Sequence, residues 1–479
     1  MLLYRFRWVF CQLETLQHCF PPNLRQFLNE LPETLDETYE RILKCINKAQ
    51  KGNAHRLFQC LAVAVRPLRV EELAELLAFD FQSSTPGGLP TLNSDWRWDS
   101  QEEAILSTCS SLIAIVASGD LRVVQFSHFS VKEYLTSPRL ARSRDVSRFH
   151  IDLEPAHTIM AQACLATLLR PDEHAGNGDA KLSPLVKYAA QHWVDHAQFE
   201  NVSSRVWDGI VDLFDSSKPH FAAWLRVHDI DERWNSFSPL SRQELGSPLY
   251  YAAFCGLYDL AEHLIMKYPE QVNARGGRIL SPLMAALHKR HFRVAILLRN
   301  HGAFVDIRGD DERTPLYAAS VTGNVDIMRW LLDQGADPNC GDNVRRTPLH
   351  VAALLGPPEA IEVLLKYNAD INSQNVIDQP PLCDVLTTCG STPEGQLVDI
   401  VRRLLEHGAD INIPNHRDLT ALHHASSSGW LEIARLLLIY GAKVDEKDEE
   451  GRTPLQLAAS KGHYQVTKLL LEHGAVPQP

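Results

Sequence analysis

The sequence predicts a mostly α-helical protein in two parts: a helical N-terminal half with one strand hairpin, then an array of stacked helix pairs. A short motif recurs about every 33 residues in the second half. The first half has apolar residues at helical spacing, then two apolar stretches joined by Ser118-Gly119-Asp120, a hairpin signal. Of the 479 residues, 45% are hydrophobic and 22% are charged, so both halves are expected to fold.

The charge balance excludes some classes of function. Lys and Arg number 47 and Asp and Glu 59, which gives a net charge of −12. Nucleic-acid binding needs a basic surface, so no nucleic-acid partner is predicted. No apolar run reaches the length of about 18 residues that a membrane span needs, so no membrane partner is predicted. The 10 cysteines are dispersed without a C-x-x-C pair, which indicates reduced thiols and a cytoplasmic location.

The N-terminal half follows the order of a winged helix. Helices are expected within 31–49, over 54–65 and over 70–78, then a loop over 82–100 and a helix over 102–110. Strands over 112–117 and 121–126 follow, and another helix begins at Phe129. We predict a winged-helix domain over 31–140. A helical spacer over 141–245 is expected to contain helices at 188–200, 205–215 and 220–228.

The second half contains two landmarks with one period. The first is Thr or Ser, Pro, Leu and then small residues, and it is spaced by 34, 33, 33, 33, 40 and 33 residues. It begins at Ser247, Ser281, Thr314, Thr347, Pro380, Thr420 and Thr453. The second, Gly-Ala or Asn-Ala, closes the units at 302, 335, 368, 408, 441 and 474. Two landmarks with a common period predict about seven stacked units over 246–479.

Each unit carries the signals of two helices. Thr314 can cap a helix that begins at Pro315, a residue tolerated at the first helical position. Leu331 and Leu332 belong to the apolar stripe of a second helix, and Gly335 permits a left-handed stop. No unit can bury its apolar face alone, so the units are expected to share one continuous core.

The period and the motifs T-P-L-H-x-A and L-L-x-x-G-A-D resemble the ankyrin repeat. This resemblance implies a curved α-solenoid whose concave face binds a protein partner. Three units depart from the pattern, and the last of them has a more polar second helix, as an end cap needs. The second has His288–His291 where a glycine is expected. The fifth carries about seven extra residues near 390–397, expected in the loop between its helices.

Three segments of the first half resemble a known module. They are LPETLDETYERIL (31–43), RPLRVEELAELLAFD (66–80) and FSHFSVKEYLTS (126–137). They resemble the winged helix that follows the nucleotide-binding NACHT module in fungal NACHT–ankyrin proteins of the STAND class, a segment also known as a GPI-inositol-deacylase-type winged helix. Residues 1–30 resemble the end of the NACHT module itself. The chain has no Gly-Lys pair and therefore no P-loop, which leaves a truncated gene model or a shortened paralogue as alternatives.

No catalytic, cofactor or metal residue is predicted in the chain as it stands. The resemblance implies a nucleotide contact for His128 only if a NACHT module is present in cis; otherwise a structural role is expected. His192 and His196 have a zinc-like spacing but no third ligand. His423 and His424 are interpreted as repeat residues. Cys383 and Cys389 have no partners for a metal site, and the acidic helix over 70–78 argues against DNA reading.

The best candidate surface is therefore the concave face of the array, with its turn tips. The predicted partner-binding residues are Arg313, Tyr317, Arg345, Arg346, His350, Arg417, Trp430 and Tyr464. The predicted function is non-catalytic protein–protein interaction with no small-molecule substrate, as the sensor or regulatory half of a fungal NLR-like signalling protein. The alternatives are the C-terminal part of a NACHT-type ATPase whose P-loop is missing and, with less support, a winged-helix DNA-binding regulator.

Overall fold

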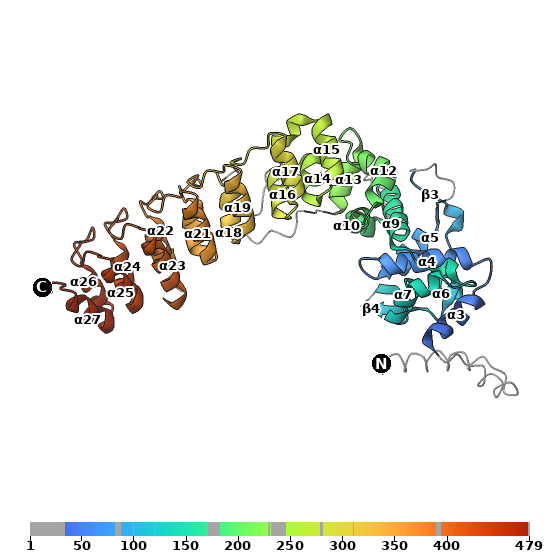
Figure 1. The fold of residues 1–479 in the computed structure, drawn as a ribbon, viewed down its shortest axis with the longest axis horizontal. Coiled ribbons are helices and arrows are strands. Elements are labelled where there is room, and N and C mark those ends of the chain that lie inside the picture. The colour runs from blue at the N-terminus through green and yellow to red at the C-terminus, as the bar shows by residue number, and fades with distance from the viewer. Residues whose placement is uncertain are drawn as a thin grey trace. The chain divides into compact units, whose positions relative to one another are not determined.

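The structure, a computed structural model, describes residues 34–81, 88–98, 100–119, 121–170, 183–228, 230, 246–277, 281–309, 311–388 and 394–477. The predicted NACHT-like segment 1–30 and Cys389 lie outside these ranges. The chain divides into two compact units, residues 1–241 and 242–479, which are described separately (Figure 1).

The described part of the first unit, from residue 34 onward, contains four helices in the predicted order before the hairpin. They are α3 (Leu35–Cys45), α4 (Lys51–Val63), α5 (Val70–Leu77) and α6 (Gln101–Cys109). Thr34 starts α3 with a reciprocal pair of hydrogen bonds to Glu37, a capping box that satisfies two helix-end amides. The apolar residues of α3 and α4 then turn inward: Tyr39, Leu43, Leu57 and Phe58 are fully or almost fully buried.

A small antiparallel sheet completes the winged helix. The hairpin of β4 (Ile113–Ser118) and β5 (Leu121–Phe126) forms as predicted, and a short strand β1 (Leu68–Arg69) pairs with β5 to give the order β1-β5-β4. A second pair, β2 (Phe79–Asp80) with β3 (Thr91–Leu92), holds both ends of a segment predicted as a loop. Helices α7 (Phe129–Leu135) and α8 (Pro138–Ala141) follow the hairpin.

The helical region that follows is built around α9 (Leu153–Leu168), which the sequence analysis did not identify. Ala156, Ala161, Leu165 and Ala166 point to different sides of this helix, and all four are buried. A helix that is apolar on every side has no amphipathic stripe, which explains why helical periodicity failed to reveal it. Around it lie α10 (Val186–Ala197), α11 (Val202–Arg205), α12 (Trp207–Leu213) and α13 (Pro219–Val227).

The second unit is a row of helix pairs (Figure 1). Within 246–277, 281–309, 311–388 and 394–477 the pairs are α14 (Pro248–Cys255) with α15 (Tyr258–Lys267), α16 (Pro282–His288) with α17 (Phe292–Asn300), α18 (Pro315–Thr322) with α19 (Val325–Asp333), α20 (Pro348–Leu355) with α21 (Pro358–Lys366), α22 (Pro381–Thr388) with α23 (Glu394–Glu406), α24 (Ala421–Ser428) with α25 (Leu431–Ile439), and α26 (Pro454–Ser460) with α27 (Tyr464–Glu472). They are numbered here as units one to seven. The predicted fold class is confirmed.

The helix starts follow the predicted capping chemistry. The hydroxyls of Ser247, Ser281, Thr314 and Thr453 accept hydrogen bonds from backbone amides of their helices. Glycine at the end of the first helix lets the chain reverse: Gly323 has φ +65°, and a Cβ there would lie 2.6 Å from Pro357 of the next unit. In unit two of the array, Arg290 adopts this left-handed conformation, with φ 61°, in place of a glycine.

A row of Asn and Asp side chains joins consecutive units. Each accepts a hydrogen bond from a backbone amide one repeat further on; Asn372 Oδ1, for example, accepts from the amide of Asp410 at 2.8 Å. The accepting residues are Asn273, Asp306, Asn339, Asn372, Asn412 and Asp445. They recur with the period of the array, so these contacts between units could have been predicted from the sequence.

The fifth unit corrects one prediction. Its extra residues were expected in the loop between the two helices, but residues 394–397 belong to α23. Helix α23 has 13 residues, whereas α21 and α25 have nine. Part of the insertion therefore adds about one turn to the second helix of the fifth unit.

Candidate partner-binding surface

The turns before the first helices of units four to seven are each shaped by a buried Asp or Asn. In unit four, Asp342 Oδ1 accepts hydrogen bonds from the amides of Val344 at 3.1 Å and Arg346 at 2.9 Å. Asn375 and Asn415 do the same in the next two turns. A side chain that bonds to the backbone a few residues on mimics a tight turn, so it presents the intervening residues at a tip.

The tips are joined to one another. A backbone amide of each tip donates to a backbone carbonyl of the tip before it: Asn343 to Asp311, Val376 to Val344, His416 to Ile377 and Glu449 to Arg417, at 3.0–3.2 Å. One residue of each tip has a left-handed backbone: Glu312, Arg345, Asp378, Asp418 and Gly451. We call residues 311–313, 343–346, 376–378, 416–418 and 449–451 the tip row.

Three of the four predicted arginines are exposed on this tip row. Arg313 forms an ion pair with Asp311 at 3.4 Å, and its guanidinium lies over the ring of Tyr317. Arg345 donates to the carbonyl of Asn375 at 2.9 Å, while Arg417 is exposed. These side chains are accessible to a partner, and Arg346 is only partly so.

The structure corrects the prediction for three other residues. Tyr317, His350 and Trp430 are buried and cannot contact a partner as they stand. Tyr317 and His350 occupy the same place in successive first helices, where each bonds to the next turn: the Tyr317 hydroxyl donates to Asp342 at 2.8 Å, and His350 Nε2 lies 3.0 Å from the carbonyl oxygen of Gln379. Tyr464 is 85% exposed, at the start of α27 rather than on the tip row.

The tip row also exposes apolar side chains. The sequence-based prediction missed them because it favoured arginine and aromatic residues. Val344, Val376 and Ile377 are exposed at adjacent tips. Val321 and Leu355, near the ends of first helices in units three and four, are exposed as well. Apolar side chains beside arginines are the composition of a protein-binding surface rather than of an active site.

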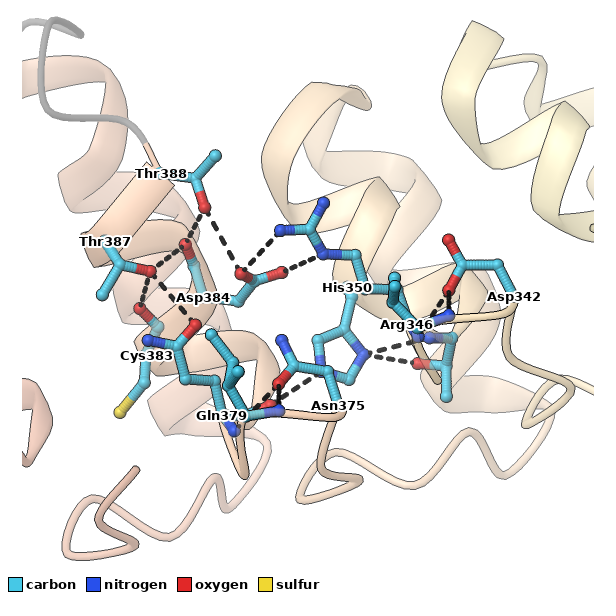
Figure 2. Close-up of polar contacts among 12 residues, drawn as sticks. Asp342, Arg346, His350, Asn375, Gln379, Cys383, Asp384, Thr387 and Thr388 are labelled. Atoms are coloured by element: carbon cyan, nitrogen blue, oxygen red, sulfur yellow. Dashed lines mark hydrogen bonds and ion pairs between the residues drawn. The ribbon is translucent and has the colours of Figure 1, made fainter. Parts of the chain in front are cut away.

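Behind the tips of units four and five lies a buried polar cluster (Figure 2). His350 Nδ1 accepts from the amide of Thr347, so Nε2 carries the proton and donates to Gln379. Burial lowers the pKa of His350, which keeps the ring neutral. The histidine therefore connects two units in one fixed tautomer.

The same cluster contains a buried ion pair. Arg346 Nε lies 3.2 Å from Asp384 Oδ2, and Arg346 Nη2 donates to Asp384 Oδ1 at 3.3 Å. The Asp384 side chain is 1% exposed, and Thr388 donates to its Oδ1. Arg346 is thus committed to the unit boundary (Figure 2). Sequence reasoning missed Asp384, although the unit before it has Val351 at the same position.

His128 has a structural position in the winged helix. Its Nδ1 accepts from the amide of Ser130 at 3.3 Å and so caps α7. It also lies 2.6 Å from the Ser130 hydroxyl, which is 2.7 Å from the hydroxyl of Tyr39. The ring thus fixes the start of α7 against α3.

The two spaced histidines do not face one ligand. His192 pairs with Asp195, whereas buried His196 contacts His157 and the hydroxyl of Tyr188. Burial lowers the pKa of His196 to about 3. Cys383 is buried, and burial raises the pKa of its thiol to about 12. No cluster of three or more His, Cys, Asp or Glu suited to a metal ion occurs among the residues that the structure describes.

Helix α5, which was considered as a DNA reader, faces the core. Glu72 is fully buried and receives both guanidinium nitrogens of Arg66, at 2.6 and 2.8 Å. Glu75 is buried and pairs with Arg97. Seven of the eight residues of α5 are buried, so this helix serves the core of the winged helix. Within the described ranges, no helix combines the length and apolar character that crossing a bilayer requires.

Comparisons with known proteins agree with this architecture. Residues 249–342, 311–375 and 390–478 match the family model of ankyrin repeats, and residues 39–147 match the winged helix domain of GPI inositol-deacylase. The chain therefore contains ankyrin repeats and a winged-helix domain of that type, which confirms both predicted modules.

One curated relative shares a long segment with the chain. It is the azaphilone pigments biosynthesis cluster protein L of Monascus ruber, which is 33% identical over 297 residues. The match covers 58% of this chain and 61% of the relative. The chain thus matches less than two thirds of the length of that relative.

Proposed function

We propose that this chain is a non-catalytic interaction protein whose ankyrin array binds a protein partner along the tip row. The observation that carries the proposal is the continuous row itself: tips joined by backbone hydrogen bonds that expose Val344, Val376 and Ile377 beside Arg345. A preorganised surface loses little conformational entropy when a partner binds. Ankyrin repeats generally mediate protein–protein binding, which supports the same conclusion.

The test is site-specific photo-crosslinking in the native cell. A photo-reactive amino acid replaces Ile377 on the tip row in the full chain, and a matched variant carries it at Arg402, which is exposed on α23. We expect one specific protein to crosslink at position 377 and not at position 402. Val344→Asp with Val376→Asp should abolish that product, because a charge would replace the apolar contact.

Crosslinking of the same protein only from position 402, or equally from both positions, would contradict the proposed surface. The double Asp variant must keep the circular dichroism of the wild type. Both substitutions lie on exposed side chains, so the fold is expected to tolerate them.

We further propose a regulatory role of the NLR-like kind for this protein, in the cytoplasm. The order of a GPI-inositol-deacylase-type winged helix and ankyrin repeats supports it, and so does the dispersion of the 10 cysteines without a C-x-x-C pair. The alternative, part of a NACHT-type ATPase, requires a P-loop upstream. Full-length sequencing of the transcript is the test: an in-frame G-x-x-x-x-G-K-[ST] would make this chain the regulatory and sensor half of a nucleotide-driven switch, and its absence would favour an ATP-independent adaptor.

The name of the Monascus ruber relative suggests a setting for such an adaptor. That protein is described by its membership of an azaphilone pigment biosynthesis cluster. We propose that the partner of this chain is a component of a biosynthetic or regulatory assembly in the organism that encodes this chain. Identification of the protein crosslinked at position 377 tests this directly.

A further inference from the structure

A groove lies at the boundary of units one, two and three, away from the tip row. It has a volume of about 590 Å³, and Arg275, Arg299 and Arg308 are among the residues that line it, with Phe304 and Asp306. Three arginines and one carboxylate line this groove in a chain whose net charge is −12. The groove is therefore positively charged, whereas the net charge of the protein is negative.

The other units of the array show that Arg299 is out of pattern. Counted back from the closing Gly-Ala or Asn-Ala, its position holds leucine in every later unit: Leu332, Leu365, Leu405, Leu438 and Leu471. Three of these, Leu332, Leu405 and Leu438, are buried. Unit two thus places a guanidinium where the repeat places a core side chain.

The guanidinium of Arg299 is poorly satisfied there. Its Nη1 and Nη2 donate to the carbonyls of Ala303 and Gln334 at 3.4 Å, the long limit for such bonds. Its Nε is buried without a hydrogen-bond partner. An unmade hydrogen bond of a charged group is costly to the fold, so an arginine at this position points to a role beyond the fold, one that its half-buried guanidinium can serve from the groove.

Phe304 departs from the pattern at the neighbouring position. The corresponding residues of units three to six are charged, Asp337, Asp370, Asp410 and Lys443. Phe304 is 63% exposed. Its backbone is ordinary, because its amide donates to Asn273 Oδ1 at 2.8 Å as in the other units. This boundary therefore differs from the later ones in its side chains. A charged side chain, Arg299, stands at the position of a leucine, and an aromatic ring, Phe304, stands at an exposed position that is charged in units three to six.

The other charged residues of the groove do not neutralise its positive charge. Arg275 makes no side-chain hydrogen bond or ion pair with another described residue, whereas Arg308 pairs with Glu312 at 2.8 Å. Asp306 accepts from the amide of Asp337, and burial raises the pKa of its carboxyl. Arg275 and Arg299 are therefore the two cations available to a ligand.

We propose that this groove binds an acidic peptide segment of a protein partner, with an Asp or Glu carboxylate on Arg299 and Arg275 and an apolar side chain against Phe304. Arginine matches a carboxylate with two parallel hydrogen bonds, and an exposed aromatic ring suits an apolar neighbour. Exposed Phe304 and Arg275 leave the groove open, so it cannot enclose a small molecule as a ligand pocket does. The proposal rests on the proposed interaction function and names the chemistry of the partner.

The probe is a random-peptide phage library selected on the full chain, with counter-selection on the double variant Arg299→Leu, Phe304→Asp. These substitutions restore the residues of the later units, so the double variant is expected to fold. We expect enriched peptides to carry Asp or Glu beside an aromatic or aliphatic residue. Enriched peptides without acidic residues, or no enrichment over the double variant, would overturn the proposal.

A double-mutant cycle then separates a contact from a structural role. For an enriched peptide, Arg299→Leu should weaken binding about tenfold, the value of one charge-assisted hydrogen bond. Replacing the peptide carboxylate by Gln or Asn should cost about tenfold with the wild type and almost nothing with Arg299→Leu. Arg402→Leu, which removes an exposed cation of α23 outside the groove, is the control and should leave binding unchanged.

The outcomes distinguish this proposal from the proposed function. Additive losses in the cycle would show that Arg299 does not touch the carboxylate and would overturn the groove. If crosslinking from position 377 still captures a partner in that case, the interaction function stands without the groove. If both experiments fail, both proposals fall.

Discussion

Two unit boundaries of the array carry a charge where the repeat normally buries an apolar side chain, and they treat it differently. Between units four and five, buried Asp384 meets Arg346 at 3.2 Å (Figure 2). In unit two, Arg299 has two long hydrogen bonds to carbonyls and a buried Nε without a partner. The first charge has its counter-ion within the chain, so it serves the fold. The second does not, so it indicates a ligand.

The largest expected effect comes from breaking the ion pair between units four and five. Arg346→Ala leaves the Asp384 carboxylate buried without its counter-ion, and we expect a loss of about 3–5 kcal/mol in local stability. Hydrogen exchange of the amides of α20 and α22 in the full chain measures it. Asp384→Val should cost less, because Arg346 is 34% exposed and can be hydrated.

The double variant Arg346→Ala, Asp384→Val is the control for that prediction. It removes both charges and introduces the valine that unit four carries at the position, so most of the loss should be recovered. Equal losses in Arg346→Ala and in the double variant would show that the pair is not the source of the stability.

The second prediction concerns His424, which occupies the position of Asp384 in unit six. Burial lowers its pKa from 6.5 to about 4, and its buried Nε2 has no hydrogen-bond partner. A lowered histidine pKa means that the unfolded state binds the proton first. Its contribution is therefore fully present above about pH 6.5 and is lost as pH falls toward 4, with about 2 kcal/mol lost between pH 7 and 5.

Amide exchange of α24 and α26 at both pH values measures this loss. His424→Leu introduces the residue that unit seven has there, Leu457, and should remove the His424 part of the pH dependence. An unchanged pH profile in the variant would contradict the assignment to His424.

The sequence predicted the fold from local chemistry that repeats. The capping residues, the left-handed stops and the helix pairs recur with the period, so each unit confirmed the next. Helix α9 escaped because it is buried on all sides, and β1 and β3 escaped because two-residue strands carry no alternation. Such elements depend on tertiary packing that no local pattern reports.

The candidate site was predicted only in part. Arg313, Arg345 and Arg417 were placed at tips because turn residues sit on the surface. Tyr317 and His350 were misjudged because residue type was weighed above repeat position; they share the position that contacts the next turn. Arg299 could have been found by aligning the units, whereas its proximity to Arg275 needed the structure.

The third prediction tests whether the Asn side chains that join consecutive units contribute equally at the two boundaries. Asn273→Ala at the groove removes two hydrogen bonds to the next repeat, one from the Phe304 amide at 2.8 Å and one to the Gly302 carbonyl at 2.9 Å. Asn339→Ala removes the equivalent bonds, from the Asp370 amide at 2.7 Å and to the Asn368 carbonyl at 3.4 Å. We expect similar losses of about 1–2 kcal/mol, measured by amide exchange at residues 304 and 370. A much smaller loss at 304 would show that the groove boundary is already loosened.

The smallest expected effect is the sharpest test of the comparison. Arg299→Leu replaces an incompletely bonded guanidinium by the residue that five other units carry there, so it should raise the stability of unit two by about 1 kcal/mol. Amide exchange of α17 measures the gain, and Leu332→Arg, which puts the charge into unit three, should instead destabilise α19. A gain in stability together with a loss of peptide binding is the signature of a residue kept for its ligand. If Arg299→Leu destabilises α17, the arginine serves the fold as Asp384 does, and the distinction between the two boundaries disappears.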